Sequence, residues 1–245
     1  AAALMTRPSA AGWIVLLWLV LWLFDAQRPR GTRRLTLYVG VLAACLLAWG
    51  LRNRAVIGAP AWLSTNGGVT LYDAQGPQAD GSSNQAFLNE LPELAGLNEL
   101  ERDRKLRQLA VEQMRKNPAR ALRLAWTKFL RTWSLVPNVS TYRAGITGVV
   151  SAAFTAGVLF LAFVGLLRTL SRKNPPAAES RNRRRLQALL WLPVVYFTLL
   201  HCVFVGSLRY RVPLMPFVEI AAATALVRAQ RRPTGSPLII SRRKE

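Results

Sequence analysis

The chain has few acidic residues, two cysteines and one histidine, and these shortages exclude several classes of protein. Cys45 and Cys202 both lie in apolar runs, so neither a structural disulfide nor a zinc site is expected. His201 is the only histidine, and we expect it to be a hydrogen-bonded polar residue between helices rather than part of a catalytic triad. The chain has no glycine-rich phosphate loop, no nucleophile elbow and no helix with paired histidines. No cofactor is evident, and a divalent metal is left open.

Basic and apolar residues are abundant instead. The 245 residues include 33 Lys and Arg against 12 Asp and Glu, a net charge of +21, and 51% are hydrophobic. A nucleic-acid-binding protein could carry this charge, but its apolar residues would be scattered in amphipathic periods. Here they form long uncharged blocks, with the basic residues between them. This pattern excludes nucleic acid as a partner and indicates a polytopic membrane protein with membrane lipids around it.

The apolar runs predict an all-α membrane protein with about five complete transmembrane helices. A bilayer core needs roughly 17–25 helical residues. The runs cover residues 9–24, 35–51, 145–167, 186–208 and 212–227. The chain starts with Ala, and residues 1–5 resemble the tail of a further apolar run. We therefore expect a truncated sixth helix and a chain that is the C-terminal part of a longer protein.

The basic residues between the runs predict the orientation of the chain. Residues 25–34 carry four Arg, 168–185 carry seven Lys or Arg, and 228–245 carry six. All three segments fall on the same side of the predicted spans, and this side should be the cytoplasm. The predicted units are helices in 1–51, an extracytoplasmic domain in 52–143, three helices in 144–227 with a basic cytoplasmic loop at 168–185, and a cytoplasmic tail at 228–245.

The domain at 52–143 is predicted to be mostly helical after a loop over residues 52–81, where Gly and Pro are frequent. One helix is expected over 98–117, with Leu106, Ala110 and Met114 on a shared face with Leu109, and a second from Pro118. In the second, Leu122, Trp126, Phe129 and Trp133 form an aromatic stripe, and Arg120, Arg123, Lys128 and Arg131 lie around the remaining face. The stripe favours either a helix lying flat in the membrane interface or one packed on the domain's own core.

Charged residues near the expected extracytoplasmic surface are the candidates for function. Arg209, Tyr210 and Arg211 fall in a short turn where the positive-inside rule disfavours Arg. Arg52 and Arg54 follow the second span, and Arg7 precedes the first complete span. The guanidinium fork suits a phosphate or pyrophosphate, while the alternative is an anchor to lipid head groups. Glu219 lies inside the last span and should pair with a neighbouring helix.

Several segments together resemble a known family. These are LRNRAVIG from Leu51, LSTNGGVTLY from Leu63, Asp80-Gly81, the Asn117-Pro118 helix with its aromatic tail, and RYRVPLMP from Arg209; TRP at Thr6 resembles a further turn. The combination resembles bacterial membrane glycosyltransferases of the C superfamily, which are relatives of protein mannosyltransferases and of the enzyme that adds aminoarabinose to lipid A. Asp73-Ala74-Gln75 departs from the Gly-Asn-rich segment expected at that place.

The resemblance implies a sugar transfer at the outer face of the bacterial cytoplasmic membrane. The donor would be a sugar on a polyprenyl phosphate, and the acceptor a lipid, glycan or protein hydroxyl. Arg209, Tyr210, Arg211, Arg52 and Arg7 would contact the donor phosphate. The family's catalytic carboxylate lies in an earlier loop, upstream of this chain. Asp73 and Asp80 do not match its position, so the catalytic residue is unknown.

Two other classes remain open at this stage. A non-catalytic membrane scaffold or assembly subunit would account for the spans and the charge asymmetry, although not for the Arg209–Arg211 turn. A transporter is disfavoured because the chain has no internal repeat and most spans lack polar residues.

Overall fold

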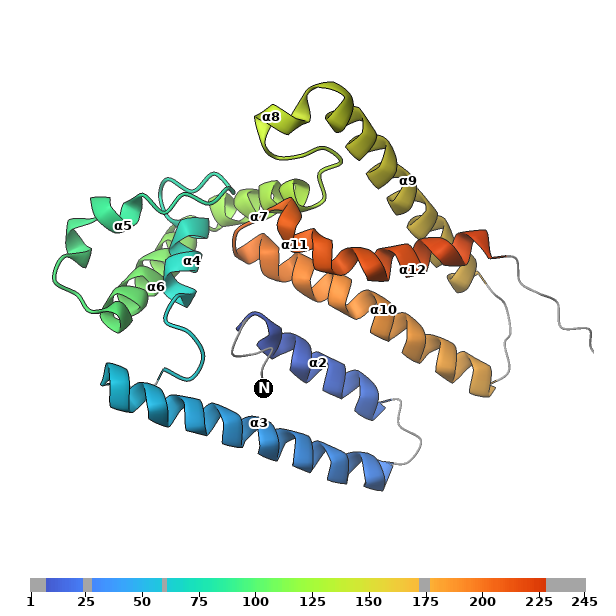
Figure 1. Ribbon diagram of the computed structural model, residues 1–245, viewed down its shortest axis with the longest axis horizontal. Helices are drawn as coiled ribbons and strands as arrows, with labels where there is room; N and C mark the ends of the chain where they lie inside the picture. The colour runs from blue at the N-terminus through green and yellow to red at the C-terminus, as the bar shows by residue number, and fades with distance from the viewer. Residues whose placement is uncertain (1–7, 24–27, 59–60, 172–176, 228–245) are drawn as a thin grey trace, which may run out of the picture.

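The computed structural model describes residues 8–23, 28–58, 61–171 and 177–227. Within these ranges the fold is all-helical and contains no strand, as the sequence predicts (Figure 1). The helices are α2 (Ala10–Leu23), α3 (Arg28–Ile57), α4 (Gly67–Gln75), α5 (Phe87–Glu90), α6 (Glu99–Lys116), α7 (Pro118–Thr132), α8 (Ser140–Arg143), α9 (Gly145–Leu170), α10 (Ala177–Val203), α11 (Leu208–Arg211) and α12 (Met215–Leu226). Short 3-10 turns occur at Pro92–Leu94 and Val212–Leu214.

Three of the described helices are long and apolar enough to cross a membrane. They cover Thr36–Ile57 in α3, Gly145–Leu170 in α9 and Asn182–Val203 in α10. The prediction of about five spans is confirmed only to this extent. α2 has 14 residues and α12 has 12, which is below the roughly 17 residues needed to cross a bilayer core.

The long apolar helices expose much of their surface. Phe154, Phe160 and Phe163 on α9 are each more than half exposed. Exposed apolar patches of this size on a soluble protein would mark an interface or cause aggregation. In a membrane they face lipid tails, so the exposure agrees with the membrane reading of the sequence.

α9, α10 and α12 form the densest part of the bundle. α12 packs along α9, and α10 contacts α12, α2 and α7. The core of this part holds Ala162, Val194, Val218, Ala221 and Ala222. At Gly165 an added Cβ would overlap the backbone oxygen of Ala221. Small residues therefore let the two helices approach closely, as is typical of membrane helix pairs.

A second compact region consists of α4, α5, α6 and α7, and we call it the α4–α7 unit. α4 packs on α6 around a core that includes Val69, Tyr72, Phe87, Leu106 and Ala110. The helix over Glu99–Lys116 and its buried Leu106 and Ala110 confirm the sequence prediction for this segment.

The predicted loop over residues 52–81 is wrong in two places. α3 continues to Ile57, and Gly67–Gln75 forms α4. Gly68 touches the backbone of Asp103 on α6, and its N–H donates to the Asp103 carboxylate. Only glycine fits there, so the Gly-Gly pair serves helix packing rather than a turn.

The N-terminus of α6 carries a capping box. The Asn98 side chain accepts from the N–H of Glu101 at 3.0 Å, and the Glu101 carboxylate accepts from the N–H of Asn98 at 3.0 Å. We expect Asn98→Ala to lower the free energy of unfolding by about 1 kcal/mol, since the N–H of Glu101 loses its acceptor. Chemical denaturation of the purified protein would measure this. Asn89→Ala, at an exposed position, is the control, and an equal loss there would contradict the prediction.

The two faces of α7 differ from the sequence prediction. Leu122 is 74% exposed and Trp126 is 62% exposed, whereas Leu124, Lys128 and Thr132 form the buried face. The alternative in which the aromatic stripe packs into the domain's own core is therefore wrong for Leu122 and Trp126. Lys128, which the sequence groups with the arginines of the basic face, is buried instead.

The helix ends are sorted to two ends of the bundle (Figure 1). The C-terminal end of α2, the start of α3, the end of α9, the start of α10 and the end of α12 all lie toward one end. These are the ends that flank the three basic segments of the sequence. The α4–α7 unit and α11 lie toward the opposite end.

Candidate functional site

The segment between α10 and α12 carries the Arg-Tyr-Arg sequence to the side of α7. α10 ends at Val203, and Ser207 in extended conformation precedes α11. A Cβ on Gly206 would lie 2.7 Å from the Cα of Lys128. The absence of a side chain at Gly206 thus lets the turn press directly on α7, which fixes its position.

Arg211 is buried at the contact between α11 and the end of α7. It is 8% exposed, and its Nη1 donates to the backbone oxygen of Ser134 at 2.7 Å. The guanidinium also lies 6.0 Å from the ring centroid of Trp133. Burial lowers the pKa of Arg211, but a guanidinium stays charged at physiological pH. No carboxylate in the described part of the chain forms an ion pair with it.

Arg209 and Tyr210 form the exposed part of the turn. Arg209 Nη2 donates to the Tyr210 hydroxyl oxygen at 2.9 Å, and the guanidinium lies 4.9 Å from the centroid of the same ring. The other side of Tyr210 stacks on His201 with centroids 3.9 Å apart. His201 Nδ1 also lies 3.2 Å from the Val205 oxygen, so His201 is a partnered polar residue as expected. The stack gives Arg209 a defined position at the surface.

Lys128 is a buried cation that sequence reasoning did not select as a site residue. Its side chain is fully enclosed, and Nζ donates to the backbone oxygen of Val203 at 3.0 Å. Gln75 Nε2 donates to the same oxygen at 2.8 Å, so α4, α7 and α10 meet at one carbonyl group. Burial is the main cause that lowers the pKa of Lys128 to about 8. No pattern in the sequence predicts this burial, because the stripe Leu124-Lys128-Thr132 is more polar than the aromatic stripe of the same helix.

The structure does not bring Arg52 or Arg54 to this turn. Arg52 donates to Asn53 Oδ1 at 2.9 Å and lies 5.2 Å from the Trp49 ring centroid. α3 packs against α2, and its C-terminal end lies away from α11 (Figure 1). Arg54 is exposed near the end of α3, and Arg7 lies outside the described residues. The proposed contribution of Arg52, Arg54 and Arg7 therefore stays a prediction.

Glu219 lies on α12 and is exposed. Among the described residues it has no hydrogen bond or ion pair. Its expected pairing within the membrane remains a prediction.

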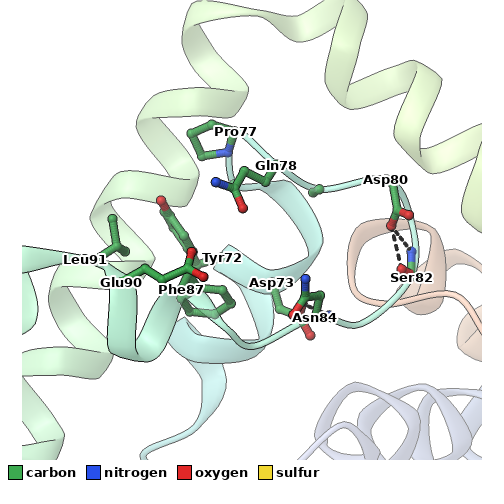
Figure 2. Close-up of a pocket in the computed structure, with 12 residues that line it drawn as sticks. Tyr72, Asp73, Pro77, Gln78, Asp80, Ser82, Asn84, Phe87, Glu90 and Leu91 are labelled. Atoms are coloured by element: carbon green, nitrogen blue, oxygen red, sulfur yellow. Dashed lines mark hydrogen bonds between the residues drawn. The ribbon is translucent and has the colours of Figure 1, made fainter.

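A pocket of about 240 Å³ opens in the α4–α7 unit (Figure 2). Tyr72, Phe87 and Glu90 lie on one side of it, and Asp80 lies on the other, next to Ser82. Tyr72 and Phe87 form a tilted aromatic pair with centroids 4.8 Å apart. The pocket thus combines an aromatic wall with carboxylates.

Arg120 holds the loop that borders the pocket. Its guanidinium donates to four backbone oxygens, those of Gln75, Gly76, Pro77 and Ala79, at 2.8–3.2 Å. The N–H of Arg120 is itself bound by the Asn117 side chain, which caps α7. One residue of α7 therefore fixes the shape of the pocket's rim.

Asp73 closes the other end of this loop. Its two carboxylate oxygens accept from Ser83 Oγ at 2.6 Å and from the N–H of Asn84 at 2.8 Å. Asp73 is 5% exposed, so it acts mainly as a loop anchor. No group of Asp, Glu, His and Cys suited to a metal ion occurs among the described residues.

No protein-family model, curated protein or solved structure matches this chain. The class that the described residues define is a helical protein in which three of the described helices are long and apolar enough to cross a membrane.

Proposed function

We propose that the chain is the C-terminal part of an integral-membrane glycosyltransferase. It takes a sugar from a polyprenyl-phosphate donor and passes it to a lipid, glycan or protein acceptor. The reaction occurs at the extracytoplasmic face of a bacterial cytoplasmic membrane. Arg209, Tyr210 and Arg211 contact the donor phosphate, and the catalytic carboxylate lies in sequence that precedes this chain.

The arrangement of Arg209 and Arg211 is the observation that carries the proposal. One guanidinium is exposed and the other is buried, and both lie where the α10–α11 turn meets α7. Neither forms an ion pair with a carboxylate in the part of the chain described. Burying an unpaired cation is costly, so such a residue is retained most easily where an anion completes the site.

The chemistry of arginine suits a lipid phosphate. Its planar fork donates two parallel hydrogen bonds to phosphate oxygens and remains charged. As the bond between the sugar and the phosphate breaks, negative charge grows on the leaving polyprenyl phosphate. Cations already held in place, Arg211 by Ser134 and Arg209 by Tyr210, stabilise that charge without reorganising.

The orientation of the protein in the membrane is inferred from the two ends of the helix bundle. Helix ends that flank the basic segments lie together, opposite the α4–α7 unit (Figure 1). Short loops rich in Lys and Arg stay in the cytoplasm. The α4–α7 unit and the Arg209–Arg211 turn then face the extracytoplasmic side, where a flipped lipid-linked sugar is presented.

The test uses the complete gene product in membranes, with Arg209→Ala, Arg211→Ala and the control Arg104→Ala on the exposed surface of α6. Release of polyprenyl phosphate from labelled polyprenyl-phosphate sugars is measured. We expect turnover to fall roughly 100-fold or more for Arg211→Ala and for Arg209→Ala, with Arg104→Ala unchanged. Expression level and thermal stability are recorded for each variant to separate loss of function from loss of fold.

Two results would contradict the proposal. Unchanged turnover in both turn variants would reduce these arginines to anchors of the membrane topology. Absence of turnover in the unmutated protein across a panel of donors would favour a non-catalytic scaffold.

A further inference from the structure

The pocket of the α4–α7 unit has a lining opposite in charge to the rest of the chain. Of its 12 lining residues none is Lys or Arg, although the chain as a whole carries 33 of them. Asp73, Asp80 and Glu90 are the charged residues that line it. The lining residues offer no cation to a phosphate group, which favours a neutral or positively charged ligand over the lipid phosphate of the donor.

Two of these carboxylates, those of Asp80 and Glu90, can accept further hydrogen bonds from a molecule in the pocket. Asp80 accepts with one oxygen, Oδ1, from both the N–H of Ser82 at 2.7 Å and its Oγ at 2.6 Å, and no side chain of the described residues donates to Oδ2. The Ser82 side chain, followed by its backbone N–H, holds the pKa of Asp80 below its usual value, so the carboxylate stays ionised. Glu90 forms neither a hydrogen bond nor an ion pair among the described residues.

The side of the pocket opposite Asp80, where Glu90 also lies, is aromatic (Figure 2). Phe87 is buried at the edge of the unit's core and pairs with Tyr72. Burial, aided by the charge of Glu93, raises the pKa of Tyr72, so its hydroxyl remains a proton donor. Gln78 and Asn84 add side-chain amides, which both donate and accept.

We propose that this pocket binds a single neutral or amino-substituted sugar ring. Sugar hydroxyls donate to carboxylates in short, charge-assisted hydrogen bonds, and the apolar face of a pyranose or furanose lies against an aromatic ring. The pocket is smaller than the 300–1,000 Å³ typical of drug-sized ligands, so one ring fits and an oligosaccharide extends outward. We assign the pocket to the sugar of the acceptor, and this assignment rests on the proposed function. The binding of a sugar in the pocket does not depend on the proposed function.

The rim is formed before a ligand arrives. The guanidinium of Arg120 fixes residues 75–79, and Asp73 fixes residues 83–84, so the loop between them is held at both ends. A preformed rim reduces the entropy lost on binding, and weak ligands such as single sugars depend on this.

Direct binding tests the proposal. The protein in lipid nanodiscs is titrated with the methyl glycosides of glucose, galactose, mannose, arabinose and glucosamine, and saturation-transfer NMR detects the bound sugar. At least one glycoside should bind saturably. Asp80→Asn and Glu90→Gln should each weaken that binding about tenfold, because a neutral acceptor replaces a charged one. Asp80→Asn keeps an oxygen for Ser82, so the loop should be preserved.

Glu112→Gln is the matched control, because Glu112 is an exposed carboxylate on α6 that pairs with Lys116 away from the pocket. Phe87→Leu removes the ring while keeping most of the volume, and it should also weaken binding. Thermal unfolding verifies that each variant is folded.

Three outcomes would overturn the inference. They are no saturable binding of any glycoside, an affinity in Asp80→Asn and Glu90→Gln equal to that of the unmutated protein, or binding of spermidine with none of the sugars, which would make the pocket a site for amines. Sugar binding without polyprenyl phosphate release would contradict the proposed function alone. Release without sugar binding would contradict the pocket alone.

Discussion

Replacing Lys128 with methionine is expected to stabilise the protein, and most strongly at neutral pH. Lys128 is fully enclosed, and burial lowers its pKa to about 8 from 10.5. Because the folded-state pKa is the lower one, the unfolded chain binds the proton more tightly. Below pH 8 the buried lysine is charged, and its burial lowers the free energy of unfolding by the full amount. The free energy of unfolding then increases as the pH rises from about 8 to 10.5. The penalty is at most about 3 kcal/mol.

Methionine fills a similar volume without the charge, and the Val203 oxygen keeps its hydrogen bond from Gln75. We expect the midpoint of thermal unfolding in detergent to rise by roughly 5–10 °C at pH 7. The gain should shrink toward pH 10. Lys116→Met, at an exposed lysine of α6, is the matched control and should follow the unmutated protein. A lower midpoint for Lys128→Met at every pH would show that the cation stabilises the fold.

Replacing Gly165 with valine is expected to separate α9 from α12. A side chain there would overlap the backbone oxygen of Ala221 and the Thr224 hydroxyl. A backbone oxygen cannot swing aside, so the helices must move apart and lose the contacts around Ala162 and Val218. We expect a loss of roughly 3 kcal/mol of stability, seen as a lower unfolding midpoint and poorer recovery from membranes.

Gly157 provides the control on the same helix. No heavy atom lies within 4 Å of a Cβ placed at Gly157, so Gly157→Val should leave the midpoint nearly unchanged. Equal losses at the two positions would mean that valine acts on the helix itself rather than on its packing. Equal stability of both would refute the close approach of α9 and α12.

The sequence predicted the helices whose signals are local. The apolar period of Leu106 and Ala110 predicted α6, and Asn117-Pro118 marked the start of α7. Hydrophobic length likewise identified α9 and α10 as long apolar helices. The sequence did not predict α4 because a Gly-Gly pair such as Gly67-Gly68 is typical of a turn. The contact that explains the pair is with Asp103, 35 residues later in the chain.

The faces of α7 could not be settled from the sequence. Leu122 and Trp126 form the more hydrophobic stripe, and in water that stripe would be buried. The structure buries Leu124, Lys128 and Thr132 instead, because the end of α10 offers its Val203 oxygen to the lysine. That partner is 75 residues away, beyond the reach of any periodicity.

The candidate site was predicted in part. The Arg209–Arg211 turn was selected because arginine is unusual at that place in the topology. Its support by Ser134, 77 residues earlier, is a tertiary contact that spacing does not reveal. The pocket was missed for the same reason, since Tyr72, Asp80 and Glu90 meet only after α4 and α5 have packed on α6.

Arg120 donates to four of the carbonyl groups of residues 75–79, which gives this segment a property that surface loops seldom have. Most surface loops tolerate an inserted residue because few contacts depend on the exact position of their backbone. Here the guanidinium of Arg120 binds four carbonyl oxygens at once, and a single inserted residue would move some of them out of hydrogen-bonding distance. A lysine, with a compact ammonium in place of the fork, would not span them either. The length of residues 75–79 is therefore fixed by one side chain, and an insertion there would disrupt the rim of the pocket.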